Sequence, residues 1–183
     1  MILDDIVRRT GERVMHLPYA VPGGYGGDTR SFKDALTGSG YKRAVIAEMK
    51  FSSPKKGCIR KNPDIRELTH LFEDGGASAV SVLTEPYYFG GSTDTIGIVK
   101  EEISLPVLRK DFIIDERQLL ETRSLGADAV LLIAGVLGDR LPSFVNRCFE
   151  LGIEPLVEVH SRKEAFCAVL SGAELIGINN RNL

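Results

Sequence analysis

Three short segments of this sequence repeat one pattern, in which a glycine and two further residues precede an apolar run. They occupy residues 76–80 (Gly-Ala-Ser-Ala-Val), 126–130 (Gly-Ala-Asp-Ala-Val) and 172–176 (Gly-Ala-Glu-Leu-Ile). A glycine commonly ends a helix, and a short apolar run bounded by turn residues is typical of a buried strand. Each segment therefore predicts the end of a helix, a two-residue turn and the beginning of a buried strand.

The same patterns predict the other elements. Strands are expected from residue 44 to the Glu48–Lys50 region and at 79–83, 106–110, 129–133, 155–159 and 175–178. Helices are expected at 2–15 and 31–36, after Asn62 as N-cap with Pro63 in the first turn, and after Asp115. Two more follow from the stripe of Leu141, Phe144, Val145, Cys148 and Phe149 and from a capping box of Ser161 and Glu164.

Strand and helix alternate roughly every 20 to 35 residues, which predicts an α/β protein with a parallel sheet. Right-handed crossovers leave an open doubly wound sheet or a closed (β/α) barrel. No Gly-x-Gly-x-x-Gly motif follows a strand, which disfavours the nucleotide-binding open sheet. We therefore expect a TIM (β/α)₈ barrel architecture with about six βα units over residues 44–183, preceded by a helical extension over residues 1–43.

Composition limits the classes of function. The chain has 183 residues and a net charge of −2, which suggests one domain and gives no support for a nucleic-acid partner. No segment is long and apolar enough for a membrane span, and no secretory signal is recognised. The three scattered cysteines indicate free thiols and a cytoplasmic location, with Cys148 and Cys167 expected in the core.

Ionisable and polar residues gather where the predicted strands end. Glu48 and Lys50 end the first strand and share one side of it, because side chains alternate along a strand. The third strand ends with Lys110 and Phe112, the fifth with Glu158 and His160, and the sixth with Asn179 and Arg181. The loop after the second strand contains Phe89. Active sites of (β/α) barrels are built at this end of the strands, so we expect one cavity there.

Two lysines and two glutamates around one cavity suit general acid and base catalysis. Asn179 adds a neutral donor, and Phe89 and Phe112 add flat apolar walls, so the expected substrate is aromatic and anionic. A Schiff base on Lys50 or Lys110, as in aldolase-type barrels, stays open as an alternative. No cluster of His, Cys and Asp predicts a metal site, and His160 is interpreted as a residue at a helix start.

Six ordered motifs from Ala44 to the last residue resemble the indole-3-glycerol phosphate synthase family. They are Glu48-x-Lys50-x-x-Ser53-Pro54-x-x-Gly57, residues 81–85 (Ser-Val-Leu-Thr-Glu), Phe89-x-Gly91-Ser92, residues 106–112 (Pro-Val-Leu-Arg-Lys-Asp-Phe), residues 156–160 (Leu-Val-Glu-Val-His) and residues 177–183 (Gly-Ile-Asn-Asn-Arg-Asn-Leu). The resemblance implies a carboxy-lyase (a decarboxylase) of tryptophan, and thus aromatic amino-acid, biosynthesis, without a metal or organic cofactor. Its substrate would be 1-(2-carboxyphenylamino)-1-deoxyribulose 5-phosphate, which loses CO₂ and water as a pyrrole ring closes.

The resemblance also assigns residues. Lys110 resembles the general acid, and Glu48 and Glu158 resemble the carboxylates that move protons or stabilise the iminium. Lys50 resembles the lysine that contacts anionic groups of the substrate and assists dehydration. Asn179 is similar to the amide that positions Glu48. The residues that resemble pocket walls are Ser53, Pro54, Phe89, Phe112, Leu131, Arg181 and Leu183.

One departure from the family is the number of strands, since eight are expected and six are predicted here. This suggests a fragment of a longer enzyme, or a chain whose open barrel edge is covered by self-association or by a partner. The alternatives to the synthase are an inactive fragment that serves as a folding or interaction unit, and another sugar-phosphate isomerase or aldolase barrel.

Overall fold

A computed structural model describes residues 2–19, 29–38, 43–61 and 63–181. Asn62 and Leu183, both singled out in the sequence, lie outside the described residues. The helices are α1 (Ile2–Val14), α2 (Phe32–Thr37), α3 (Ile65–Asp74), α4 (Pro86–Phe89), α5 (Asp94–Glu102), α6 (Glu116–Ser124), α7 (Ala134–Leu137), α8 (Leu141–Glu150) and α9 (Arg162–Leu170), with a 3₁₀ turn at Gly138–Arg140. The strands are β1 (Ile46–Met49), β2 (Ser52–Ser53), β3 (Gly57–Cys58), β4 (Ala79–Leu83), β5 (Val107–Lys110), β6 (Ala129–Ile133), β7 (Glu154–Val159) and β8 (Leu175–Ile178).

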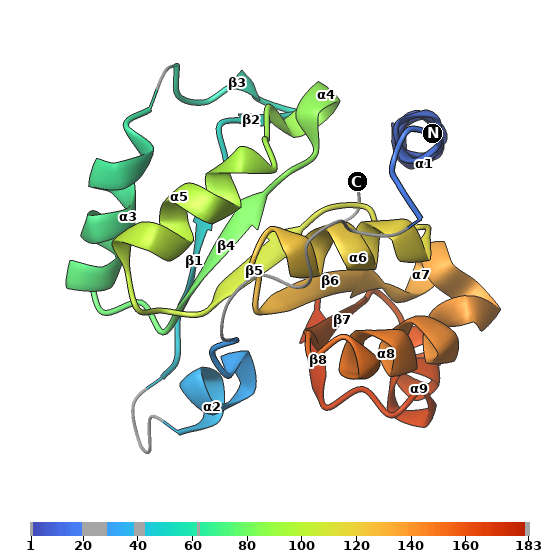
Figure 1. The fold of residues 1–183 in the computed structure, drawn as a ribbon. Helices are drawn as coiled ribbons and strands as arrows, with labels where there is room; N and C mark the ends of the chain where they lie inside the picture. Colours follow the sequence, from blue (N-terminus) through green and yellow to red (C-terminus); the bar gives the residue numbers. More distant parts are fainter. Residues whose placement is uncertain (1, 20–28, 39–42, 62, 182–183) are drawn as a thin grey trace.

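Six strands form one parallel sheet in the order β1-β4-β5-β6-β7-β8, which confirms the predicted architecture. The sheet curls into part of a barrel, with helices outside it and the carboxyl ends of the strands at one pole (Figure 1). Strands β2 and β3 form a small antiparallel hairpin directly after β1. In the described part of the chain, no helix is long and apolar enough to cross a membrane.

The glycines of the repeated segments do what the pattern predicts. Gly76, Gly126 and Gly172 have φ values of 80°, 80° and 81°, a left-handed conformation that glycine adopts without steric cost. Each of these glycines follows a helix, and two residues separate it from the next strand. The three helix-to-strand junctions are therefore built alike.

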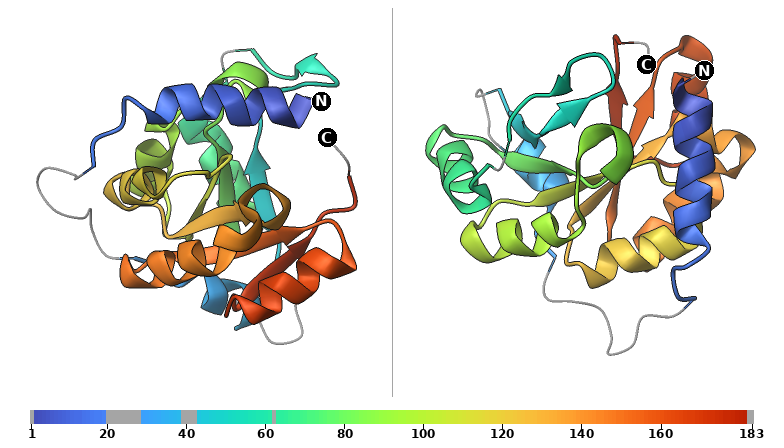
Figure 2. Two further views of the ribbon diagram at one scale, coloured as in Figure 1. Left: turned by 90° about the vertical axis from the view of Figure 1, so that its right-hand side faces the viewer. Right: turned by 90° about the horizontal axis from the view of Figure 1, so that it is seen from above.

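Side chains of the strands separate into two layers, because they alternate across the sheet. The outward layer packs against helices, as Val130, Val157 and Val159 do against α8 and α9. The inward layer fills the interior of the curl and is closed at both poles. Phe32 of α2 packs at the amino end of the strands, and Ile6 of α1 packs among apolar side chains at the carboxyl end. Figure 2 shows α1 lying across that end.

The sheet has two edge strands among the described residues, β1 and β8. Ile178 on the outward side of β8 is 78% exposed, and Phe166 and Leu170 on α9 are 65% and 69% exposed. Cys167 is also exposed, so its predicted core position is wrong, whereas Cys148 is buried as expected. The reason is that α9 is apolar on both sides, and among the described residues only its inner side is covered.

The beginning of α3 differs from the expectation. The side chain of Asp64 accepts a hydrogen bond from the backbone N–H of Glu67 at 3.1 Å and is the N-cap. Pro63 therefore precedes the helix and does not occupy its first turn. Both Asn62 and Asp64 are good capping residues, and sequence alone did not separate two candidates two positions apart.

Candidate active site

A cavity of about 190 Å³ opens at the carboxyl end of the strands. Its walls come from β1, β4, β5, β6, β7 and the segment after β8, so side chains distant in the sequence meet there. It is lined by Glu48, Lys50, Leu83, Glu85, Phe89, Lys110, Asp111, Phe112, Leu131, Ile133, Glu158, Asn179 and Arg181. Nine of the twelve predicted site residues thus border one cavity.

Glu48 is the acidic centre of this cavity. Its Oε2 atom lies 2.6 Å from Nζ of Lys110, and its Oε1 atom lies 4.0 Å from Nζ of Lys50. About a third of each of the three side chains is exposed, so all of them are open to a bound molecule. One carboxylate thus lies between two ammonium groups.

Glu158 forms a second acidic position across the cavity. The Nδ2 atom of Asn179 donates to Oε1 of Glu158 at 3.0 Å, and Nε2 of His160 lies 3.6 Å from the same oxygen. The resemblance implied that the amide of Asn179 positions Glu48, but in the structure its hydrogen-bond partner is Glu158. His160 also begins the turn into α9, where its N–H donates to Glu164 at 2.9 Å.

Phe89 and Phe112 form the apolar wall. Their ring centroids are 6.1 Å apart with an interplanar angle of 34°, and Nζ of Lys50 lies 5.5 Å from the centroid of Phe89. Leu131 packs in the same cluster. A flat aromatic group could contact both rings while its charged substituents reach Lys50 or Lys110.

The position of Phe89 depends on a buried carboxylate that sequence reasoning did not assign to this role. Glu85 is 2% exposed, and its side chain accepts hydrogen bonds from the N–H groups of Tyr87, Tyr88 and Phe89. A carboxylate at the beginning of a helix satisfies donors that have no partner within the helix. Helix α4 is a single turn, which is too short to give a periodic sequence signal.

Ser53 and Pro54 lie beside this cavity in a second one of about 500 Å³, which also contains Glu48, Lys50, Phe89 and Arg181. The two cavities share these four residues and form one connected cleft. The β2–β3 hairpin supplies the outer wall, and Oγ of Ser53 accepts a hydrogen bond from the N–H of Lys56 at 3.2 Å. Lys55 and Lys56 also line it, which makes this part of the cleft cationic.

Helix α1 lies beside the cleft at the carboxyl end of the strands, and its Ile2 borders the second cavity. Arg13 forms an ion pair with Asp111 at 2.7 Å, and the hydroxyl of Tyr88 donates to Asp5. The hydrogen bond from Tyr88, together with contacts from Arg8, lowers the pKa of Asp5 to about 2. These contacts bind α1 to β5 and α4, and sequence reasoning gave no signal for them beyond the apolar residues of the helix.

The described residues contain no group of three or more His, Cys, Asp or Glu side chains placed to hold a metal ion. What they do offer is two carboxylates, two ammonium groups and an amide around an aromatic wall. Such a set can protonate an oxygen atom, accept a proton from carbon and stabilise charge as it develops.

Comparison with known proteins identifies relatives of this chain. The family model described as indole-3-glycerol phosphate synthase matches residues 7–183. An indole-3-glycerol phosphate synthase of Clostridium acetobutylicum is 45% identical over 191 residues, covering the whole of this chain and 72% of that protein. One from Chlorobium phaeovibrioides is 47% identical over 155 residues, covering 84% of this chain and 60% of that protein.

Solved structures of lower sequence similarity share the fold. A mandelate oxidase matches with a TM-score of 0.56 at 14% identity, over 73% of this chain and 48% of its own. A methylornithine synthase matches with a TM-score of 0.55 at 16% identity, over 80% of this chain and 56% of its own. Together with the family model and the relatives above 40% identity, the fold and the cavity lead to one conclusion: the chain belongs to the indole-3-glycerol phosphate synthase family.

Proposed function

We propose that the cleft binds 1-(2-carboxyphenylamino)-1-deoxyribulose 5-phosphate and converts it to indole-3-glycerol phosphate, CO₂ and water. A bond forms between the ring carbon that carries the carboxyl group and the ketone carbon of the sugar chain. The bond from that ring carbon to the carboxyl group then breaks, and its electron pair restores the aromatic ring. Loss of the new hydroxyl group as water, with a proton from the neighbouring carbon, completes the pyrrole ring.

Lys110 is the proposed general acid for ring closure. As the ketone carbon is attacked, its oxygen becomes negative and needs a proton. The observation that carries the proposal is the contact of 2.6 Å between Lys110 and Glu48, because it places a proton donor and a carboxylate side by side in the cleft. Glu48 would in turn stabilise the positive charge that develops on the ring nitrogen, or return a proton to Lys110.

Glu158 is the proposed base for the dehydration step. It lies on the opposite side of the cavity from Glu48, and its hydrogen bond from Asn179 holds one oxygen in place. The leaving hydroxyl requires a proton, and the neighbouring carbon must lose one. We assign the first role to Lys50 and the second to Glu158, because they face the cavity from different strands.

The aromatic ring of the substrate would lie against Phe89, Phe112 and Leu131, and its anionic groups would meet the cationic part of the cleft. Lys50 and Arg181 border both cavities, so they are placed to contact an anionic group that spans them. Ser53 and Pro54 would form the outer wall. Leu183 was assigned to the same wall, and it lies outside the described residues.

The test is turnover by the purified chain, followed by the fluorescence of the indole product, with Lys110→Met as the matched inactive control. Turnover that depends on Lys110 supports the proposal. A chain that binds a reduced substrate analogue without turnover would instead be the inactive binding unit that the sequence left open. No binding and no turnover would exclude both.

The Schiff-base alternative has less support. A lysine forms a Schiff base through its terminal nitrogen, and Nζ of Lys110 lies 2.6 Å from Glu48, so a substrate carbonyl would have to displace this contact. Borohydride reduction in the presence of substrate separates the two mechanisms. A covalent adduct at Lys50 or Lys110 would favour the aldolase type, and turnover that is insensitive to borohydride favours general acid catalysis.

Two further assignments follow from the surface and the cysteines. The three thiols are unpaired, which agrees with a cytoplasmic enzyme. The exposed apolar side chains of α9 and β8 support association of that edge with a second polypeptide or a second copy. Sedimentation of the chain beside Phe166→Glu would test this, since a charge there should reduce association.

A further inference from the structure

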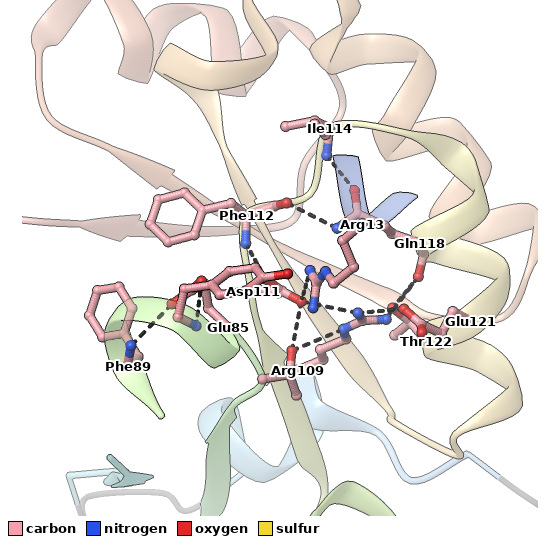
Figure 3. Close-up of polar contacts among 12 residues, drawn as sticks. Arg13, Glu85, Phe89, Arg109, Asp111, Phe112, Ile114, Gln118, Glu121 and Thr122 are labelled. Carbon is pink, nitrogen blue, oxygen red and sulfur yellow. Dashed lines mark hydrogen bonds and ion pairs between the residues drawn. The ribbon is translucent and has the colours of Figure 1, made fainter. Parts of the chain in front are cut away.

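Lys110 is bracketed by two buried charges. Its sequence neighbours Arg109 and Asp111 are 0% and 2% exposed, whereas a third of the Lys110 side chain is exposed in the cleft. Because side chains alternate along a strand, Arg109 faces the helices on the outer side of β5, whereas Asp111 directly follows the strand and borders the cavity. Figure 3 shows both residues in a network of polar contacts, which extends to the side opposite the phenyl ring of Phe112.

Arg109 connects three elements through its guanidinium group. Its Nη2 atom donates to Asp111 at 3.0 Å and to Glu121 of α6 at 2.6 Å. Its Nη1 atom donates to the hydroxyl of Thr122 at 3.0 Å, and its Nε atom to the hydroxyl of Thr84 at 3.3 Å. The rigid planar fork of an arginine makes such a set of contacts directional, so β5 is held against β4 and α6.

Asp111 fixes the backbone on the other side of Lys110. Its Oδ2 atom accepts from Thr84 at 2.8 Å and from Arg13 of α1 at 2.7 Å, and its Oδ1 atom accepts from the N–H of Phe112 at 2.9 Å. Burial alone raises the pKa of this carboxyl, but Arg109 and Arg13 outweigh burial and hold the pKa below its usual value. The carboxylate is therefore charged and fully used.

Such a network is not needed for packing. Buried ion pairs are often replaceable by apolar side chains without loss of stability, and the outward positions of β4 and β6 are filled by valine and leucine. What the network does provide is a fixed orientation of the backbone around Lys110. The carbonyl of Lys110 also accepts from the N–H of Thr84 at 3.0 Å, so residues 109, 110 and 111 are all tied to β4.

We propose that Arg109 and Asp111 are positioning residues, which fix the backbone on either side of Lys110 and so hold its side chain against Glu48. The importance of this for turnover rests on the proposed function, but the positioning itself does not. A displacement of about 1 Å at a reacting group costs about a hundredfold in rate, which is the scale on which the network would act.

The first measurement needs no turnover. The Lys110 side chain is observed by the NMR signal of its ¹³C-labelled ε-carbon at one fixed pH, assigned with Lys110→Arg. Glu48→Gln removes its ionic partner and should move this signal in the parent protein. In the Asp111→Asn background the same substitution should move it much less, because Lys110 is no longer held at Glu48.

The matched control is Asp128→Asn. Asp128 is 1% exposed and paired with Lys100 at 2.7 Å, but it lies at the amino end of β6, at the opposite pole from the cleft. Its loss should lower stability while leaving the effect of Glu48→Gln on the Lys110 signal unchanged. Arg109→Lys, which keeps the charge, should behave between the parent and Arg109→Met.

The second measurement is kinetic. In a chain that turns over, Arg109→Met and Asp111→Asn should lower kcat about a hundredfold with little change in KM, since substrate still binds in the cleft. The proposal is overturned if Glu48→Gln moves the Lys110 signal equally in the parent and Asp111→Asn backgrounds. The NMR measurement can be made whether or not the chain is active. Failure of this proposal is therefore distinguishable from failure of the proposed function.

Discussion

Glu48 and Lys110 meet across a strand to which neither belongs. Glu48 is on β1 and Lys110 on β5, with β4 between them, and their charged atoms are 2.6 Å apart above it. Two strands of a flat sheet separated by a third lie about 10 Å apart. The contact therefore requires both long side chains to lean over Ser81 and Leu83 on the concave face, and it exists because the sheet curls.

Removing the ammonium group of Lys110 should affect the chemical step. We expect Lys110→Ala to lower kcat by about 10²–10⁴-fold, as is typical for loss of a general acid, with a smaller effect on KM. Glu158→Gln should also act mainly on kcat. Steady-state kinetics with the substrate named above test this, and unchanged turnover in Lys110→Ala would refute the assignment of the acid.

Ser53→Ala should instead act on binding. Oγ of Ser53 accepts from the N–H of Lys56, so the hydroxyl orders the loop that carries two lysines of the outer wall. Loss of one such hydrogen bond, worth about 1 kcal/mol, should raise KM about fivefold while kcat is kept. Ser143→Ala on α8, where a hydroxyl also bonds to the local backbone, is the matched control.

Much of this site could be predicted from the sequence, because its residues lie at the carboxyl ends of strands. The strands themselves are recognisable from their apolar residues and from the glycines that precede them. The bounds of β4, β6 and β8 agree with the predicted ranges. The shared side of Glu48 and Lys50 followed from their spacing, and both border the cavity.

The features that could not be predicted depend on short helices or on contacts between distant segments. The role of Glu85 was missed because α4 is one turn long, and α5 was not predicted at all, since its apolar residues give no clear helical stripe. The ion pair of Lys100 with the buried Asp128, at the amino end of β6, was not predicted either. The ion pair of Arg13 with Asp111 joins residues 98 positions apart, and no local sequence pattern predicts such a contact.

A methyl group at position 91 should displace the segment that carries Phe89. A Cβ atom built on Gly91 would overlap the carbonyl oxygen of Leu83, which is backbone of β4 and cannot move easily. We expect Gly91→Ala to destabilise the fold by about 1–3 kcal/mol. Gly97→Ala on α5 is the control, because a Cβ atom there meets nothing within 4 Å and alanine favours helix by about 1 kcal/mol. Urea unfolding should move the two midpoints in opposite directions.

The three thiols should differ in reactivity. Burial raises the pKa of Cys148 to about 12, whereas Cys58 and Cys167 are exposed. An alkylating reagent at pH about 8 attacks thiolates, so it should modify Cys58 and Cys167 in the folded chain and spare Cys148. Mass spectrometry of the peptides measures all three at once. Rapid labelling of Cys148 without denaturant would contradict the packing of α8.

Acid should destabilise the chain partly through Asp111. Its pKa is lowered from 3.8 in the folded state, because Arg109 and Arg13 outweigh the effect of burial. A depressed carboxyl pKa contributes stability that is present above the unfolded value and is lost as the pH falls from there toward the folded value. Unfolding free energy should therefore decline as the pH falls below about 4.

Asp111→Asn isolates this contribution. At neutral pH it should cost roughly 3–5 kcal/mol, since the buried Arg109 and the half-buried Arg13 lose their shared partner. Its stability should then fall less steeply in acid than that of the parent, because the titrating group is gone. Glu67→Gln, at an exposed position on α3, should leave both the stability and its acid dependence nearly unchanged. Parallel acid slopes for the parent and Asp111→Asn, measured by urea unfolding between pH about 2 and 7, would show that Asp111 is not the carboxylate that the arginines stabilise.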